Sequence, residues 1–78
     1  MLSLTSFGVE QNLKTKLYRI YFLSDTLKLY LGEDIITENP TEALETEDIS
    51  FAFEELYNVM QDDDFLTHLK ACIALGGD

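Results

Sequence analysis

The alternation of apolar and polar residues along 17–32 predicts a β-hairpin. In the second half of this stretch every other residue is leucine, and a period of two is typical of a half-buried strand. We expect strands 17–23 and 26–32, joined by a turn at 24–25. One face of the hairpin is then wholly apolar, and it comprises Tyr18, Ile20, Phe22, Leu27, Leu29 and Leu31.

The expected register also orders the opposite face of the hairpin. Tyr21 would lie across from Lys28, and Arg19 across from Tyr30, so that each ring meets a cation. Because a slip by one residue would exchange the two faces, the pattern specifies this register. A helix over the same residues would place Lys16 within an apolar arc, so we favour the hairpin.

Weaker signals lie on both sides of the hairpin. Residues 2–10 are the candidate for a third strand, although Gly8 interrupts them. Residues 32–40 are typical of a connector. At its end, Asn39 has the form of a helix start, because Pro follows it and Glu comes three residues after it.

Helical periodicity follows in the acidic part of the chain. We expect a first helix over about 47–61, capped by the hydroxyl of Thr46 and with two acids in its first turn. At 100° per residue, its apolar residues share one side. These residues are Ile49, Ala52, Phe53, Leu56, Tyr57, Val59 and Met60.

A second helix is expected over about 64–75. Asp62 or Asp63 can cap it and Gly76 can close it, and Phe65, Leu66, Leu69, Cys72 and Ile73 form its apolar stripe. The whole pattern predicts one α+β domain over residues 1–78. In it, a small antiparallel sheet packs against two C-terminal helices on one face.

The net charge of −10 is distributed unevenly along the chain. Residues 33–64 hold twelve carboxylates and no Lys or Arg, whereas residues 1–32 hold four basic and two acidic side chains. Direct binding of nucleic acid is disfavoured, because affinity for phosphates comes from Lys and Arg. The repulsion within residues 33–64 destabilises the compact state. A basic protein partner, or a need for solubility alone, would account for this concentration of acids.

The acidic side of the first helix is the predicted partner-binding surface. Phe51 projects from the middle of that side, and Leu44 would share it if the helix began at Asn39. Aromatic residues ringed by polar groups are the usual anchors of protein interfaces. The predicted binding residues are Leu44, Glu47, Asp48, Phe51, Glu54, Glu55, Asn58, Asp62 and Asp63.

The residues that could carry chemistry match no catalytic or metal motif. His68, Cys72 and Asp64 could share a helix edge, but a structural zinc site needs four ligands. The consecutive acids 62–64 lack the alternating ligands and central Gly of an EF-hand loop. Nucleophile–base pairs and glycine-rich phosphate loops are missing as well. We therefore expect no enzymatic activity, no metal and no cofactor.

Cysteine usage and hydropathy bear on the compartment of the protein. The single cysteine excludes an internal disulfide, which fits a reducing environment. No apolar run reaches the roughly 18 residues of a membrane helix, and the start "MLSLTSFG" lacks the features of a signal peptide. We expect a cytoplasmic protein, in the host cytoplasm if it is viral.

Two functional hypotheses follow. The first is a non-enzymatic inhibitor that docks its acidic helix face on a basic, nucleic-acid-binding surface of another protein. In size and charge the chain is similar to the small acidic proteins that phages use against host nucleases and CRISPR complexes, some of which mimic nucleic acid. The alternative is a structural or assembly protein. It would form a homodimer through the unpaired hairpin edge or the exposed rows of Tyr21 and Tyr30.

Overall fold

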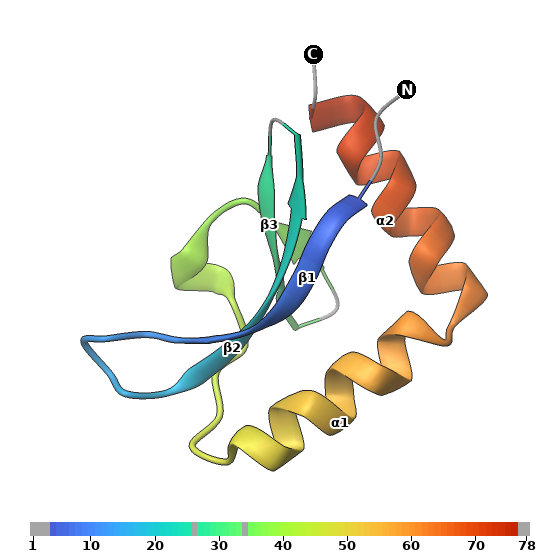
Figure 1. The fold of residues 1–78 in the computed structure, drawn as a ribbon. Coiled ribbons are helices and arrows are strands. Elements are labelled where there is room, and N and C mark those ends of the chain that lie inside the picture. The colour runs from blue at the N-terminus through green and yellow to red at the C-terminus, as the bar shows by residue number, and fades with distance from the viewer. Residues whose placement is uncertain (1–3, 26, 34, 77–78) are drawn as a thin grey trace.

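The computed structural model describes residues 4–25, 27–33 and 35–76, in which an antiparallel sheet carries two helices (Figure 1). The four strands lie in the order of the sequence, so each pairs with its neighbour along the chain. The elements are β1 (Leu4–Gln11), β2 (Tyr18–Ser24), β3 (Lys28–Leu31), β4 (Ile36–Thr37), the 3-10 turn η1 (Pro40–Glu42), α1 (Ile49–Met60) and α2 (Asp63–Gly76). The predicted α+β class is confirmed.

The β2–β3 hairpin forms, but the predicted register is wrong by two residues. Phe22 lies opposite Leu29 rather than Leu27, and Tyr21 lies opposite Tyr30 rather than Lys28. The reason is Ser24, which is buried and bonds to the backbone N–H of Leu27 through its hydroxyl at 3.1 Å. Ser24 therefore ends the strand instead of opening the turn. Because the shift is an even number of residues, every side chain keeps its predicted face.

The candidate third strand over 2–10 is confirmed from Leu4 onward as β1, which pairs with β2, while residues 2–3 lie outside the described residues. Gly8 does not interrupt it, because Gly8 stands opposite Tyr21 and leaves room for the tyrosine ring. A Cβ at this position would lie 3.2 Å from the Tyr21 hydroxyl oxygen.

Two additions to the sheet had no signal in the pattern. The predicted connector contains β4, in which Ile36 pairs with Leu31 of β3. Farther along the chain, Thr46 exchanges two backbone hydrogen bonds of 2.8 and 2.9 Å with Tyr18. The hairpin edge that was expected to be unpaired is therefore covered. The expected exposed aromatic row is also absent, since Tyr30 is only 7% exposed.

The helix caps agree with the sequence only in part. Asn39 caps η1 as predicted, yet the helix stops at once because Ala43 is extended. Asp48 caps α1, since its carboxylate accepts the N–H groups of Ser50 and Phe51 at 2.9 and 3.4 Å. Thr46 was the predicted cap, but its backbone belongs to the sheet.

Of the two predicted caps of α2, Asp62 and Asp63, the structure shows Asp62 in this role. The carboxylate of Asp62 accepts the N–H groups of Asp64 and Phe65 at 3.0 and 3.3 Å.

Within the ranges that the structure describes, no helix is long and apolar enough to cross a membrane.

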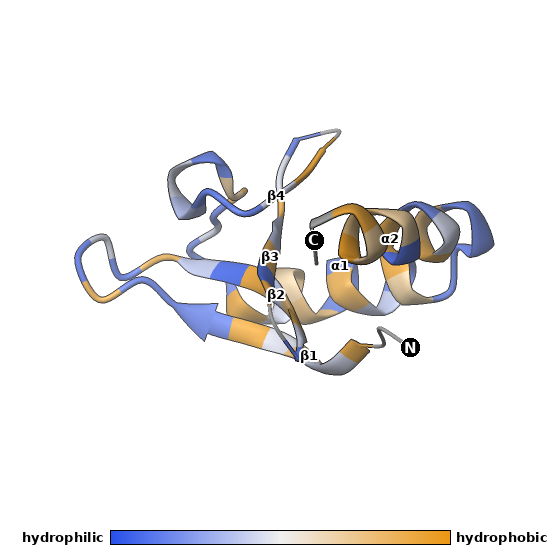
Figure 2. Ribbon diagram, turned by 90° about the horizontal axis from the view of Figure 1, so that it is seen from above, coloured by the Kyte–Doolittle hydropathy of each residue, from blue (hydrophilic) through white to orange (hydrophobic). Residues whose placement is uncertain are grey.

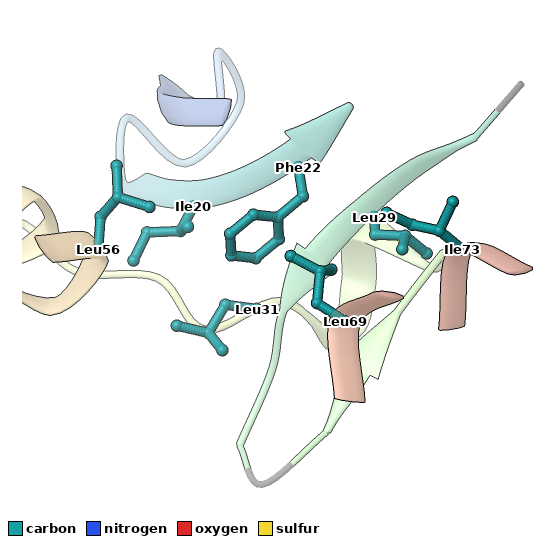
Figure 3. Close-up of a cluster of buried hydrophobic side chains, with 7 residues drawn as sticks. All are labelled: Ile20, Phe22, Leu29, Leu31, Leu56, Leu69 and Ile73. Atoms are coloured by element: carbon teal, nitrogen blue, oxygen red, sulfur yellow. The ribbon is translucent and has the colours of Figure 1, made fainter. Parts of the chain in front are cut away.

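The core lies between the sheet and the helices, which occupy the same side of β2 and β3 (Figures 1 and 2). Phe22 and Leu69 are its largest fully buried side chains. The ring of Phe65 lies 5.6 Å from that of Phe22, centroid to centroid, and extends this cluster. Figure 3 shows its seven buried members, which are Ile20, Phe22, Leu29, Leu31, Leu56, Leu69 and Ile73.

Helix α1 presents only part of its predicted apolar side to this core. Ala52 and Leu56 are buried, whereas Phe53 and Tyr57 are exposed and Glu55 is half-buried. The helix packs on β1, β2 and α2. The surface that these three elements offer is narrower than the apolar side of the helix, so Phe53 and Tyr57 remain exposed to solvent. The predicted apolar and acidic sides of α1 are therefore rotated relative to the core.

Candidate partner-binding groove

A groove runs between α1, residues 43–46 and the end of β3. Its first part encloses about 240 Å³ and its second part about 470 Å³, which extends toward the start of α2 and the β3–β4 turn. Leu31, Leu44 and Glu55 line both parts, so the groove is continuous.

One wall of the groove is fixed by the sheet. The backbone N–H of Leu44 donates to the carbonyl oxygen of Leu31 at 2.9 Å, and Thr46 is held against Tyr18. Gly32 permits this close approach, because a Cβ there would lie 2.9 Å from the carbonyl oxygen of Glu42. The side chain of Leu44 is thereby held, half exposed, at the rim.

The opposite wall is the first half of α1. The Asp48 cap sets the first turn, so that Phe51 and Glu55, one turn apart, both line the groove. Phe51 remains 54% exposed, while Glu55 is half-buried. Leu44 and Phe51 thus border one cavity. Leu44 reaches it from a segment that is hydrogen-bonded to β3, and not from a continuous helix that begins at Asn39.

The predicted binding residues divide into two groups. The groove brings together Leu44, Phe51, Glu55 and Asp62. The other five are exposed and line neither part of it; they are Glu47, Asp48, Glu54, Asn58 and Asp63. Both groups have members on α1, but only the first group lines the groove.

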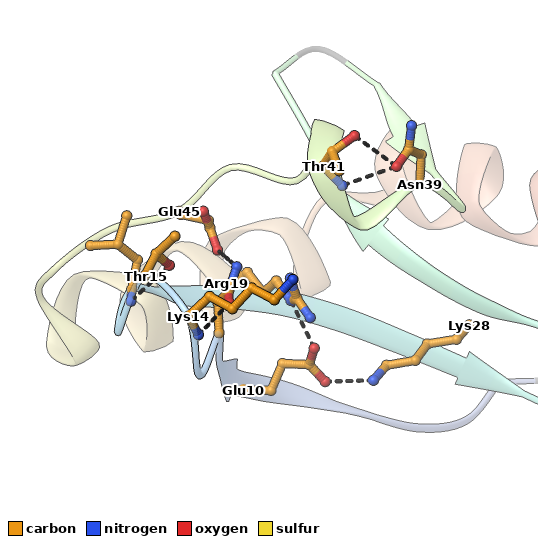
Figure 4. Close-up of polar contacts among 10 residues, drawn as sticks. Glu10, Lys14, Thr15, Arg19, Lys28, Asn39, Thr41 and Glu45 are labelled. Carbon is orange, nitrogen blue, oxygen red and sulfur yellow. Dashed lines mark hydrogen bonds and ion pairs between the residues drawn. The ribbon is translucent and has the colours of Figure 1, made fainter.

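Several groove residues were missed by the sequence reasoning. Glu45 was passed over in the acidic run, and its carboxylate accepts a hydrogen bond of 3.0 Å from the side-chain amide of Asn12 (Figure 4). Glu33, Asp64 and His68 line the second part of the groove. Spacing along the chain gives no signal for them, because α2 and the 43–46 segment, which are distant in sequence from β3, meet its end only in the fold.

Arg19 and Lys14 lie close to the groove acid Glu45, but among the described residues no ion pair joins a base to a carboxylate of the groove. The guanidinium of Arg19 borders the first part but is bound to Glu10, with an Nε–Oε2 distance of 2.7 Å. Lys28 contacts the other oxygen of Glu10 at 2.6 Å (Figure 4). Of the bases in the first 32 residues, Lys14 and Lys16 stand exposed in the β1–β2 turn. The groove therefore keeps its negative character.

The Glu10 cluster also shifts the titration of its members. Burial alone would raise the pKa of Glu10, but the hydrogen bonds and charges of Lys28 and Arg19 outweigh it and lower that pKa. The hydrogen bond that Lys28 donates to the Glu10 carboxylate in turn raises the pKa of Lys28.

The predicted contacts between cations and rings form despite the changed register. Arg19 lies 4.9 Å from the centroid of Tyr30, and Lys28 lies 5.2 Å from that of Tyr21. Each cation reaches its ring diagonally across the strands.

The ligands considered for a metal site are not gathered. Among residues 4–25, 27–33 and 35–76, no three or more His, Cys, Asp or Glu side chains are arranged to hold a metal ion. The Nε2 of His68 lies 3.8 Å from the sulfur of Cys72, one turn along α2.

Comparison of the chain with protein families, with curated proteins and with solved structures finds no match.

Proposed function

We propose that this chain is a non-enzymatic inhibitor that seats a basic, nucleic-acid-binding surface of a partner protein in its acidic groove. The observation that carries the proposal is the groove itself. Its apolar floor and anchors, Leu31, Leu44 and Phe51, lie among the carboxylates of Glu33, Glu45, Glu55, Asp62 and Asp64.

The apolar part of the groove would supply affinity. Leu44 and Phe51 are large side chains that stay half exposed on opposite walls of the same cavity. Fully burying such a side chain is worth about 1.5–3 kcal/mol. A central apolar anchor with a polar border is also the usual anatomy of an interface hot spot.

The carboxylates would select the partner and speed its approach. Acids that lie on a row of cationic side chains replace the phosphates that those cations otherwise bind. Opposite charges steer the encounter and exclude acidic competitors. The partner site we infer therefore carries Lys and Arg around an apolar residue that fits between Leu44 and Phe51.

The test compares two charge reversals on neighbouring residues of α1. Glu55→Lys changes the groove, whereas Glu54→Lys changes net charge equally but lies outside it. Each chain is used to capture proteins from nuclease-treated lysate at ~50 mM and ~200 mM salt. We expect one basic protein that the wild type and Glu54→Lys retain at low salt, and that Glu55→Lys loses.

Capture that does not depend on salt would contradict the proposal. Equal loss in both variants would contradict it as well, because only net charge would then matter and the groove would have no special role.

A further inference from the structure

A second cavity lies on the flank of α1 that faces away from the groove. It encloses about 410 Å³ and is lined by Phe7, Phe53, Leu56, Tyr57, Met60 and Gln61. Phe7, Phe53 and Tyr57 are 46%, 52% and 67% exposed. Adjacent aromatic side chains left outside the core mark an interaction surface.

Strand β1 borders this cavity and is an edge of the sheet. It pairs with β2, and on its other side no strand lies within the part of the chain that the structure describes. At eight residues it is the longest strand. It contains no Pro or Lys to protect its edge, and its one irregularity is at Thr5. Residues 6–11 can therefore accept another strand.

This face is nearly free of charge on a chain of net charge −10. No lining residue of the cavity is ionised, and the one carboxylate of β1, Glu10, is bound by Arg19 and Lys28. A basic partner would gain nothing here. A second copy of the chain carries the same negative charge, so it is repelled by every acidic surface and can approach through a neutral one.

We infer that two copies associate through this face, with β1 of one copy antiparallel to β1 of the other. An antiparallel pair of identical strands is self-complementary about a two-fold axis, as a closed dimer requires. Phe7 stands opposite Phe22 and so lies on the helix-bearing face. The two-fold axis would bring the Phe7, Phe53 and Tyr57 clusters of both copies together beneath a continuous sheet.

This dimer goes beyond the proposed function and is independent of it. The acidic groove lies on the other flank of α1, so both grooves stay open and the dimer is bivalent. A rigid pair of sites gains avidity wherever the partner repeats its basic surface.

The test uses two matched variants of one helix. Phe53→Glu places a charge in the neutral face, and Phe51→Glu places the same charge at the groove, at nearly equal exposure. Light scattering over a range of concentrations should give the wild type and Phe51→Glu twice the 8.9 kDa of one chain. Phe53→Glu should remain at a single chain mass, with an unchanged circular dichroism spectrum.

Amide exchange locates the contact. The N–H groups of residues 6–11 should exchange more slowly in concentrated than in dilute wild-type protein, and at one rate in Phe53→Glu. A wild type that stays monomeric at high concentration would overturn the inference. So would a dimer that Phe51→Glu dissociates as readily as Phe53→Glu, or one whose β1 amides show no protection.

Failure of the dimer and failure of the proposed function give different results. A monomeric wild type that still loses its basic partner on Glu55→Lys overturns only the dimer. A dimer that captures no partner overturns only the proposed inhibitor.

Discussion

The two flanks of α1 expose phenylalanines to nearly the same extent but differ in the charge of the residues that line each cavity. Phe51 is 54% exposed beside Glu55 and Leu44, and Phe53 is 52% exposed beside Phe7 and uncharged residues. The apolar content of each flank is similar, so charge separates the partners that each can take. An acidic border favours a basic surface, whereas a neutral border tolerates a second acidic chain.

Both flanks depend on one core, so its loss has the largest expected effect. Leu69 is fully buried between α2 and the sheet, and Leu69→Ala should lower the free energy of unfolding by about 3–5 kcal/mol. The measurement is urea unfolding followed by circular dichroism. Leu75→Ala is the control on the same helix, since Leu75 is exposed and should change stability by less than about 0.5 kcal/mol. Equal effects would place the core elsewhere.

Gly32→Ala should damage the groove flank selectively. Its new methyl group would lie 2.8 Å from Ile35 and 2.9 Å from the carbonyl oxygen of Glu42, which displaces the wall that holds Leu44. We expect a loss of about 1–3 kcal/mol by overpacking, with reduced partner capture and an intact dimer. Gly8→Ala is the control, because its closest neighbour is the movable side chain of Tyr21. A Gly32→Ala variant as stable as the wild type would show that the wall can yield.

Removal of the cap of α1 should loosen the turn that carries Phe51. Asp48→Ala leaves the N–H groups of Ser50 and Phe51 without their acceptor, at a cost of about 1 kcal/mol. Thermal unfolding measures the loss. Glu47→Ala removes the same charge next to the cap and should cost less than about 0.5 kcal/mol. If both variants lose equal stability, charge rather than capping sets the effect.

The smallest expected effect concerns Glu10 of β1, whose charge is offset by Arg19 and Lys28. Glu10→Gln should lower the free energy of unfolding by no more than about 1 kcal/mol at neutral pH, because the pair with Lys28 is partly exposed. Folding lowers the pKa of Glu10, so its contribution is present above the unfolded pKa and is lost as pH falls through the folded pKa.

The corresponding measurement is urea unfolding over a pH series. The difference between the wild type and Glu10→Gln should shrink below about pH 4. The pKa of Lys28 is raised, so its share is present below its unfolded pKa and is lost as pH rises through the folded value, above about pH 10. A constant difference over the whole series would mean that the Glu10 cluster does not stabilise the fold.

The flanks also show where sequence reasoning succeeds and where it stops. Local patterns predicted the hairpin faces, both helices, the cap at Asn39 and a cap of the second helix at Asp62 or Asp63, because each depends on residues a few positions apart. The predicted register was wrong because Ser24 belongs to the strand, where its buried hydroxyl accepts the N–H of Leu27. The prediction of which side of α1 is buried was only partly right, because the buried part depends on the width of the sheet beneath the helix.

The groove itself was beyond reach of the sequence pattern. It forms because Thr46 pairs with Tyr18 and Ala43 bridges Gly32, and these contacts join residues far apart in the chain. Periodicity placed Phe51 on an exposed acidic side, which is correct. It placed Glu54 on equal terms with Glu55, although only Glu55 lines the groove.

The most direct test of the two-flank comparison is partner binding by Phe51→Ala and Phe53→Ala, side by side. Each chain is immobilised sparsely, so that every groove acts alone, and the captured basic protein is titrated at low salt. Loss of the anchor in Phe51→Ala should weaken binding by about 2 kcal/mol, or roughly 30-fold, while Phe53→Ala binds as the wild type does. Equal affinities of the two variants, or a greater loss in Phe53→Ala, would contradict the assignment of the acidic groove as the partner-binding site.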